Sequence, residues 1–210
     1  MLPRLLPMLA VPAEPFDSSE YSFEVKWDGI RALAAVDKGG WQLWGWERAD
    51  YTGRYPELDV LRRLPAGTLV DGELVVMDPD GRPDLRRLLR RHGLTDPWRI
   101  RQARHWCPVQ YVLFDLLYHA GRSLIHEPLV RRRELLAALC RRLDVAEVRF
   151  SDAVVGAGRT LYEAAVVRGH EGVIAKHLAS AYRPGRRSAA WRKIKRRPQW
   201  TGSQPQIASY

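Results

Sequence analysis

The chain has 210 residues, of which 46% are hydrophobic and 28% charged, and its formal net charge is +10. This content is enough for one domain with a substantial core, and no apolar stretch approaches the length of a membrane span. Four prolines within the first 15 residues argue against a signal peptide. The two cysteines and six histidines form no spaced ligand set, which argues against zinc and a disulfide framework and favours a reducing cytoplasm.

The positive charge is concentrated in the second part of the chain. Residues 1–80 contain 8 Lys and Arg against 14 Asp and Glu, a net charge of −6, whereas residues 81–210 contain 26 against 10, a net charge of +16. This imbalance favours a polyanionic partner, because each phosphate contact releases counterions. Some of these arginines are expected on solvated helix faces instead. The candidates for phosphate contact are Arg86, Arg87, Arg90, Arg91, Arg131, Arg132, Arg133, Arg141, Arg142, Arg183, Arg186 and Arg187.

The pattern along the chain predicts mostly antiparallel strands with intervening helices. Residues 21–27 read as a strand that ends at an Asp-Gly turn, and residues 30–36 and 41–46 continue it as a meander. Lys26 is then expected near the first corner of this meander. Two further apolar runs predict strands over residues 68–77 and 109–117.

Helical periodicity and helix-ending signals predict four helices. The last of them stops at Gly169, a common residue at helix C-termini. No repeat or low-complexity linker interrupts the chain, so we expect one domain over residues 1–200 and a polar tail over residues 201–210. The helices are predicted over residues 56–64, 85–92, 128–143 and 160–168.

Lysine is scarce in this chain, and its positions are informative. Only five of the 34 basic side chains are lysines, and four of the five lie in three short segments. A lysine amine can lose its proton and attack an electrophile, whereas a guanidinium group stays protonated. The alternative explanation is codon bias combined with chance. The four residues are Lys26, Lys176, Lys193 and Lys195.

The segment from Glu24 to Arg31 has the residue types that covalent catalysis on a phosphate needs. Lys26 and Asp28 are two residues apart and are expected on one side of a strand. A glycine follows and allows a tight turn, after which Arg31 returns a second cation. Lys193 and Lys195 alternate with an isoleucine, which predicts a strand that faces a phosphate with both amines.

Two acidic segments complete the candidate site. Glu73 and Glu171 each lie beside a glycine in an apolar strand. A divalent metal that bridges them to a triphosphate is one possible partner, since Mg²⁺ favours one or two carboxylates together with phosphate oxygens and water. For either acid alone, the alternative is a salt bridge at a sheet edge.

Taken in order, these segments resemble the motifs of the nucleotidyltransferase domain shared by ATP-dependent polynucleotide ligases and mRNA-capping enzymes. A lone Lys-x-Asp-Gly is a weak signal, but five further segments follow it in the family's order. Residues 52–58 are similar to DNA ligases rather than to capping enzymes, and residues 114–117 and 191–195 look like bacterial DNA ligases of the end-joining and repair type. The matching segments are residues 26–31, 47–48 (Glu-Arg, where the family more often has Ser-Arg), 71–73, 111–116, 171–174 and 193–195.

The resemblance implies a role for each matching residue. Lys26 would attack the α-phosphate of ATP to form lysyl-AMP, the AMP would pass to a DNA 5′-phosphate, and a 3′-hydroxyl would displace it. Glu73 and Glu171 would contact the ribose or bind Mg²⁺ or Mn²⁺, Phe114 would stack on adenine, and Glu24 would line the adenine pocket. Asp28 would support the site, Lys176 would face the nucleotide, and the phosphate ligands would be Arg31, Arg48, Lys193 and Lys195.

The expected fold is therefore an α+β, ATP-grasp-like nucleotidyltransferase domain of antiparallel sheets flanked by helices. Such ligases continue into an OB-fold domain, and the 13 residues after Arg197 are too few for one. We thus expect no C-terminal OB fold, and we expect lysine adenylation either to be slow or to depend on a partner protein that supplies the domain. The expected substrate is DNA with nicks or breaks, in a nucleoid-associated cytoplasmic setting without a membrane. An RNA ligase or capping-type enzyme, and a non-catalytic module that binds nucleotide or DNA ends, remain the alternatives.

Overall fold

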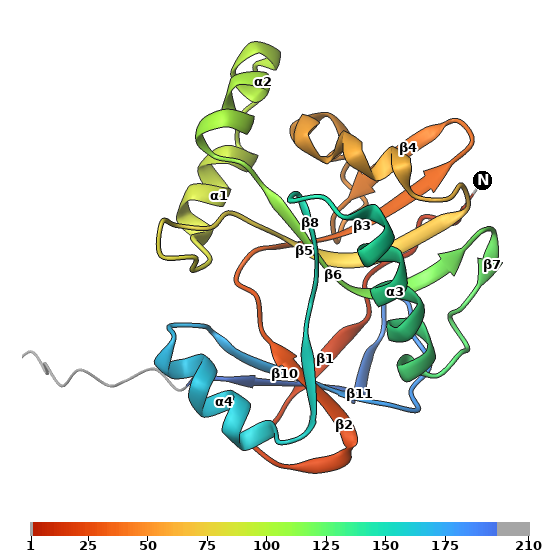
Figure 1. Cartoon of the computed structure of the whole chain (residues 1–210), viewed down its shortest axis with the longest axis vertical. Coiled ribbons are helices and arrows are strands. Elements are labelled where there is room, and N and C mark those ends of the chain that lie inside the picture. The colour runs from red at the N-terminus through yellow and green to blue at the C-terminus, as the bar shows by residue number, and fades with distance from the viewer. Residues whose placement is uncertain (1, 197–210) are drawn as a thin grey trace, which may run out of the picture.

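The computed structural model describes residues 2–196, which form two β-sheets that pack against each other and carry helices (Figure 1). The five-stranded sheet has the order β1 (Leu9–Pro12), β11 (Arg187–Lys195), β10 (Gly172–His177), β2 (Ser18–Val25) and β9 (Ala153–Gly156). The six-stranded sheet has the order β4 (Gly40–Trp44), β3 (Ile30–Asp37), β5 (Thr68–Val75), β6 (Gln110–His119) and β7 (Arg122–Ser123), and β8 (Val148–Phe150) pairs with β6.

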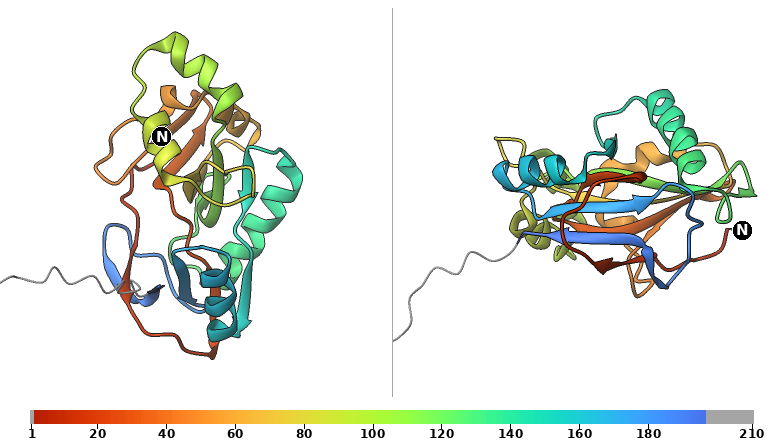
Figure 2. Two further views of the ribbon diagram at one scale, coloured as in Figure 1. Left: turned by 90° about the vertical axis from the view of Figure 1, so that its left-hand side faces the viewer. Right: turned by 90° about the horizontal axis from the view of Figure 1, so that it is seen from below.

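Three apolar clusters explain the layering, which the turned views also show (Figure 2). The largest lies between the six-stranded sheet and three helices, with Leu58, Leu88 and Leu136 among its members. A second joins the sheets, because it contains Phe114 of β6 and Trp191 of β11. The third lies between the five-stranded sheet and Ala165 of a further helix. Apolar cover on both faces of β6 accounts for its nearly continuous apolar sequence.

The second half of the predicted meander is confirmed, because β3 and β4 pair as a hairpin, but its first half is wrong, because β2 and β3 belong to different sheets. The strand that holds Glu24 ends at Val25, so Lys26 to Gly29 form the crossing between the sheets and are not a hairpin turn. The expectation of antiparallel sheets also needs correction. The pairs β1–β11 and β6–β8 are parallel, and both sheets are therefore mixed.

Three of the four predicted helices are α-helices close to their predicted bounds, the fourth is a 3₁₀ helix, and one further α-helix was not predicted. α1 (Leu85–His92) has the predicted bounds, and α3 (Leu129–Leu143) and α4 (Gly158–Val167) differ from the predictions by one or two residues. Residues 56–64 form a 3₁₀ helix, η2 (Pro56–Arg63), which follows the shorter η1 (Thr52–Arg54). α2 (Pro97–Trp106) was not predicted, although the side chain of Asp96 caps its first turn and proline is its first residue.

Within residues 2–196, no helix is both long enough and apolar enough to cross a membrane. The tail predicted over residues 201–210 lies outside the described residues.

Candidate active site

A cavity of about 210 Å³ lies where the two sheets meet. Both sheets contribute to its wall, because strands β2, β10 and β11 come from one sheet and β3, β5 and β6 from the other. The cavity gathers seven of the sequence-predicted site residues, which lie far apart in the chain. The lining residues are Leu9, Ala10, Glu24, Val25, Lys26, Trp27, Arg31, Glu73, Phe114, Ile174, Lys176, Arg187, Trp191 and Lys193.

Lys26 is fixed by its backbone and by its ammonium group. Its N–H donates to the carbonyl oxygen of Gly172 at 2.9 Å, which ties the crossing segment to the start of β10. The Nζ atom of Lys26 pairs with one carboxylate oxygen of Glu171, and Lys195 Nζ pairs with the other at 2.5 Å. The structure thus brings Lys26 and Lys195 to one carboxylate, a contact that the sequence did not predict.

The acids near Lys26 differ in their protonation chemistry. Burial acts to raise the pKa of Glu171, but hydrogen bonds from Lys195 and Lys26 outweigh it and lower that pKa below its usual value. At Asp28, burial and the charge of Glu171 raise the pKa. Glu171 is therefore held as a carboxylate beside the amine of Lys26.

Gly29 makes room for the neighbouring acid. A Cβ atom at this position would lie 2.1 Å from the Leu74 carbonyl oxygen and 2.9 Å from Cγ of Glu73. Glu73 itself lines the cavity, and burial, the largest cause, raises its pKa to about 7. Its carboxyl group has no hydrogen bond or ion pair with another described residue. It is therefore available to a ligand in the cavity.

Arg31 lines the cavity, and a buried hydrogen-bond network holds its guanidinium group in place. Its Nε and Nη2 atoms donate to the two oxygens of Asp71 at 2.7 and 2.6 Å, and Nη2 also donates to the Met8 carbonyl oxygen at 3.2 Å. The hydroxyl of Tyr182 donates to Asp71 at 2.6 Å. Burial opposes the charge, but Asp71 more than compensates and raises the Arg31 pKa. The two Nη1 donors of Arg31 remain for a ligand.

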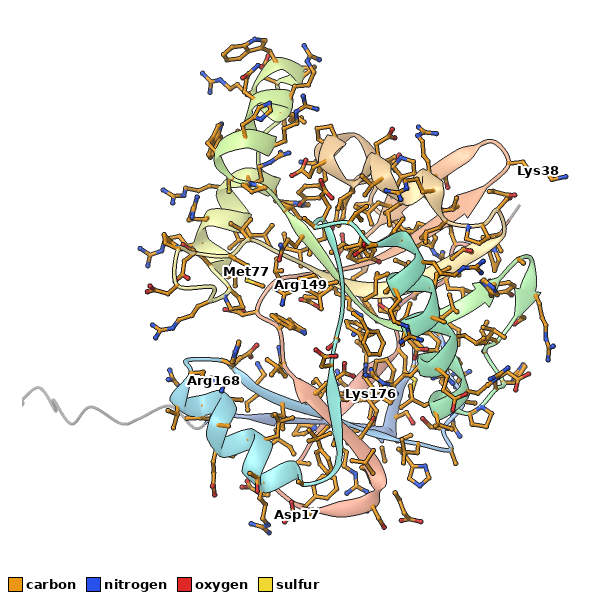
Figure 3. The ribbon with its side chains drawn as sticks, viewed as in Figure 1. Asp17, Lys38, Met77, Arg149, Arg168 and Lys176 are labelled. Atoms are coloured by element: carbon orange, nitrogen blue, oxygen red, sulfur yellow. The ribbon has the colours of Figure 1, made fainter. Side chains whose placement is uncertain are left out.

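The inner end of the cavity is a buried ion-pair cluster. Lys176, labelled between the sheets in Figure 3, pairs with Glu24, and its Nζ lies 4.1 Å from the Phe114 ring centroid and 4.3 Å from that of Trp191. Arg133 donates to the other oxygen of Glu24 at 3.3 Å. Burial lowers the Lys176 pKa despite the carboxylate. The aromatic rings thus lie beside the charges that define this end of the cavity.

Arg48 is the predicted site residue that the structure does not bring to the others. It lies in the turn after β4 with a φ of 59° and an exposed side chain, and it is absent from the cavity wall. This placement gives no support to a contact with the nucleotide phosphates.

Three of the arginines predicted to contact phosphate are instead buried in ion pairs. Arg91 pairs with Glu57 at 3.3 Å, and Arg132 donates to both oxygens of Asp115 at 2.7 and 2.9 Å. The third is Arg133, which contacts Glu24 as described above. Their side chains are unavailable to a polyanion because a buried charge needs its partner.

Sequence reasoning missed Trp191 as part of the cavity wall, although a signal for it was present. Trp191, Lys193 and Lys195 are every second residue of β11 and therefore point to the same face. Trp27 also lines the cavity, and its indole nitrogen donates to the Ser151 hydroxyl at 3.1 Å. No local sequence signal identified that long-range bond.

Comparisons with known proteins identify the family of the chain. The family model described as "ATP dependent DNA ligase domain" matches residues 7–195. A probable DNA ligase from Anaeromyxobacter sp. strain Fw109-5 is 36% identical over 205 residues, which are 93% of this chain and 39% of the relative. The multifunctional non-homologous end joining protein LigD from Pseudomonas aeruginosa is 36% identical over 196 residues, 91% of this chain and 22% of LigD.

The solved structures give the same result. The structure described as "mycobacterial DNA ligase D complexed with ATP and MES" has a TM-score of 0.76 and 33% identity, and the match covers 91% of this chain and 60% of that one. The ligase domain of Mycobacterium tuberculosis LigD also has a TM-score of 0.76, with 34% identity. The chain spans less than half of the two curated relatives named above. With its fold, its cavity and the match over residues 7–195, the chain belongs to the ATP-dependent DNA ligase domain family.

Proposed function

We propose that this chain is the catalytic nucleotidyltransferase domain of an ATP-dependent DNA ligase. The observation that carries the proposal is the position of Lys26, whose amine lies in a cavity between two sheets and against a single carboxylate. The named relatives are DNA ligases and end-joining proteins, and one solved neighbour is described as complexed with ATP. These descriptions support ATP as the nucleotide and DNA as the substrate.

In the first step Lys26 forms a covalent bond to AMP. The ammonium group loses a proton, for which the Glu171 carboxylate is the acceptor already paired with Nζ. The free amine attacks the α-phosphorus of ATP, a P–N bond forms, and the bond to the oxygen that bridges to the β-phosphate breaks. Pyrophosphate leaves with that electron pair. Lys193 and Arg31 line the cavity and would hold phosphate oxygens during the transfer.

The residues of the cavity fit one divalent cation, Mg²⁺ or Mn²⁺, held partly by the nucleotide. Among residues 2–196 no cluster of three or more potential metal ligands exists, so the protein alone forms no complete cage. Glu73 offers a carboxyl group that no other described residue pairs with, and Glu171, paired with Lys26, is the second acid. When bound, the cation would neutralise phosphate charge, in keeping with the preference of Mg²⁺ for one or two carboxylates and phosphate oxygens.

At the other end of the cavity, Phe114 and Glu24 would bind the base. The Phe114 ring lies under two cations and beside Trp191, so its position is fixed before ligand binding. A planar base can stack on such a ring, and Glu24 and Lys176 supply an acceptor and a donor nearby.

In the later steps AMP would pass from Lys26 to a 5′-phosphate at a nick or break. The 3′-hydroxyl would then attack that phosphate and release AMP, which seals the strand. The strong positive charge after residue 80 supports the binding of DNA. A partner protein that supplies an OB-fold or end-binding function, in the repair of DNA ends, is part of this proposal.

The first test is intact mass spectrometry of the purified chain before and after incubation with ATP and Mg²⁺. We expect a species heavier by one AMP, which is absent from Lys26→Ala. Lys38→Ala is the matched control, because Lys38 is the lysine outside the four site positions and lies on the distant β3–β4 turn (Figure 3). An adduct that persists in Lys26→Ala would refute the assignment of the nucleophile.

Two further arms separate the alternatives. Labelling by GTP in place of ATP would favour a capping-type enzyme, and transfer of AMP to RNA ends in preference to DNA ends would favour an RNA ligase. Tight ATP binding without any adduct, also after addition of an OB-domain partner and Mn²⁺, would favour a non-catalytic binding module.

A further inference from the structure

The helical arm formed by α1 and α2 (residues 85–106, the α1–α2 arm) extends from the six-stranded sheet at the top of Figure 1. Its α2 part is weakly packed, because only Ala103 of its ten residues is buried, whereas α1 places Leu88 in the core cluster of the six-stranded sheet. No residue of the arm lines the cavity. The arm is therefore a separate surface, whose composition the reaction at Lys26 does not explain.

The arm carries a high local charge. It contains seven arginines and one aspartate, a net charge of +6. The aspartate is Asp96, which caps α2, and of the arginines only Arg91 is buried, against Glu57. Within the described chain, no ion pair involves Arg86, Arg90, Arg99 or Arg101, so these guanidinium groups are available to an external anion.

Exposed aromatic rings accompany this charge. Trp98 and Trp106 are 62% and 57% exposed, the two highest values among the tryptophans of residues 2–196. Trp98, Arg101 and His105 have the spacing i, i+3, i+7 and so share a face of α2 that lies opposite Ala103. The two indoles lie eight residues apart, or ~12 Å along the helix axis. That separation is large enough for the two indoles to stack on different bases of one strand.

We propose that the α1–α2 arm binds single-stranded DNA, with bases stacked on Trp98 and Trp106 and phosphates paired with its free arginines. Sites for single strands combine a cationic track with aromatic platforms, because unpaired bases expose faces that a duplex keeps stacked. A dimer that pairs two arms with each other is disfavoured, since two arms of charge +6 repel each other. An acidic protein segment satisfies the charge, but a single strand also presents a planar base at every residue to stack on the two indoles.

The test measures binding of the whole chain to a fluorescent 12-nucleotide oligothymidylate and to a blunt 12-base-pair duplex by anisotropy. We expect Trp98→Ala and Trp106→Ala each to weaken binding of the single strand by roughly tenfold, since one stacked base contributes on that scale. Binding of the duplex should change less than twofold. Trp46→Ala is the matched control, because Trp46 is 43% exposed outside the arm.

Further readouts keep the result unambiguous. Circular dichroism confirms that the variants fold, and formation of lysyl-AMP should be unchanged, so this test stands apart from that of Lys26. Arg101→Gln should reduce the salt dependence of single-strand binding, whereas Arg149→Gln on β8 should not. The proposal is overturned if the Trp98→Ala/Trp106→Ala double variant keeps the affinity of the wild type, or if it loses affinity equally for the single strand and the duplex. It is also overturned if the wild-type chain is a dimer and this double variant is a monomer.

Discussion

Two glutamates in one cavity have opposite protonation tendencies, and the reason is local. Glu171 has a lowered pKa because Lys26 and Lys195 donate to its two oxygens. Glu73 has neither donor, so burial dominates and raises its pKa to about 7. The local environment thus separates the two acids: Glu171 is held ionised beside Lys26, whereas the ionised form of Glu73 is disfavoured by burial.

The raised pKa of Glu73 predicts a specific dependence of stability on pH. A carboxyl group whose pKa is higher in the folded state favours folding below its unfolded value of 4.5, and this contribution is lost as pH rises through 7. Glu73→Gln removes the titration, so the variant should gain up to about 3 kcal/mol over the wild type between pH 4.5 and 7.5. Urea unfolding at several pH values measures this gain. Formation of lysyl-AMP should fall in the same variant.

Glu134→Gln is the control for this experiment, because Glu134 is exposed and pairs only with Arg131. Its stability difference from wild type should stay within about 1 kcal/mol at every pH. Parallel pH profiles for wild type and Glu73→Gln would show that the buried carboxyl group of Glu73 does not titrate as described.

The chemistry of single residues also explains which site residues could be recognised in the sequence. Lys26, Lys193 and Lys195 stand out because lysine is rare in this chain and chemically distinct from arginine. Arg132 and Arg133 resemble surface charges in a run of three arginines, yet both point inward to buried acids. Their acidic partners are 17 and 109 residues away, and no local pattern encodes such a pairing.

At the scale of elements, a helix could be predicted where one of its faces is buried, and was missed where almost none of its residues is buried. α1 was predicted with its bounds, since a capping aspartate precedes it and a glycine follows it. α2 was missed because a helix with one buried residue has no apolar period to recognise. The Asp28-Gly29 pair predicted a hairpin, but Gly29 is required by its contact with the Leu74 carbonyl group.

A second glycine determines how β10 and β11 meet. Gly172 has a φ of +144°, and a Cβ atom there would lie 2.0 Å from the Ile194 carbonyl oxygen. Gly172→Ala should therefore separate the strands beside Glu171 and Lys195, lower the free energy of unfolding by about 3 kcal/mol and reduce lysyl-AMP formation more than tenfold. Urea unfolding and intact mass spectrometry measure the two effects.

Gly81→Ala separates the steric contact from backbone strain alone. Gly81 also has a positive φ, of +76°, but a Cβ atom there would meet nothing within 4 Å. This control should lose only about 1 kcal/mol, with normal formation of lysyl-AMP. An equal loss in both variants would mean that the contact with Ile194 does not determine the strand pairing.

At the scale of the whole molecule, the active cavity exists only where both sheets are folded and in contact. The five-stranded sheet supplies Lys26 from the end of β2 and Lys193 from β11, whereas the six-stranded sheet supplies Arg31, Glu73 and Phe114. The apolar cluster that contains Phe114 and Trp191 joins the sheets beside the cavity. A ligand that contacts both walls should therefore stabilise the two sheets as one cooperative unit.

Thermal unfolding of Lys26→Ala with ATP and without divalent metal tests this coupling, since neither covalent transfer nor metal binding contributes. At an ATP concentration of 100 times Kd, ligand binding stabilises the folded state by about 2.7 kcal/mol. For a chain of this length we expect one transition that moves up by roughly 5–10 °C. Tripolyphosphate at matched ionic strength should shift it less, because it leaves the Phe114 end of the cavity empty. Two transitions, of which ATP moves only one, would mean that the sheets unfold independently and that the cavity wall of one sheet binds the nucleotide alone.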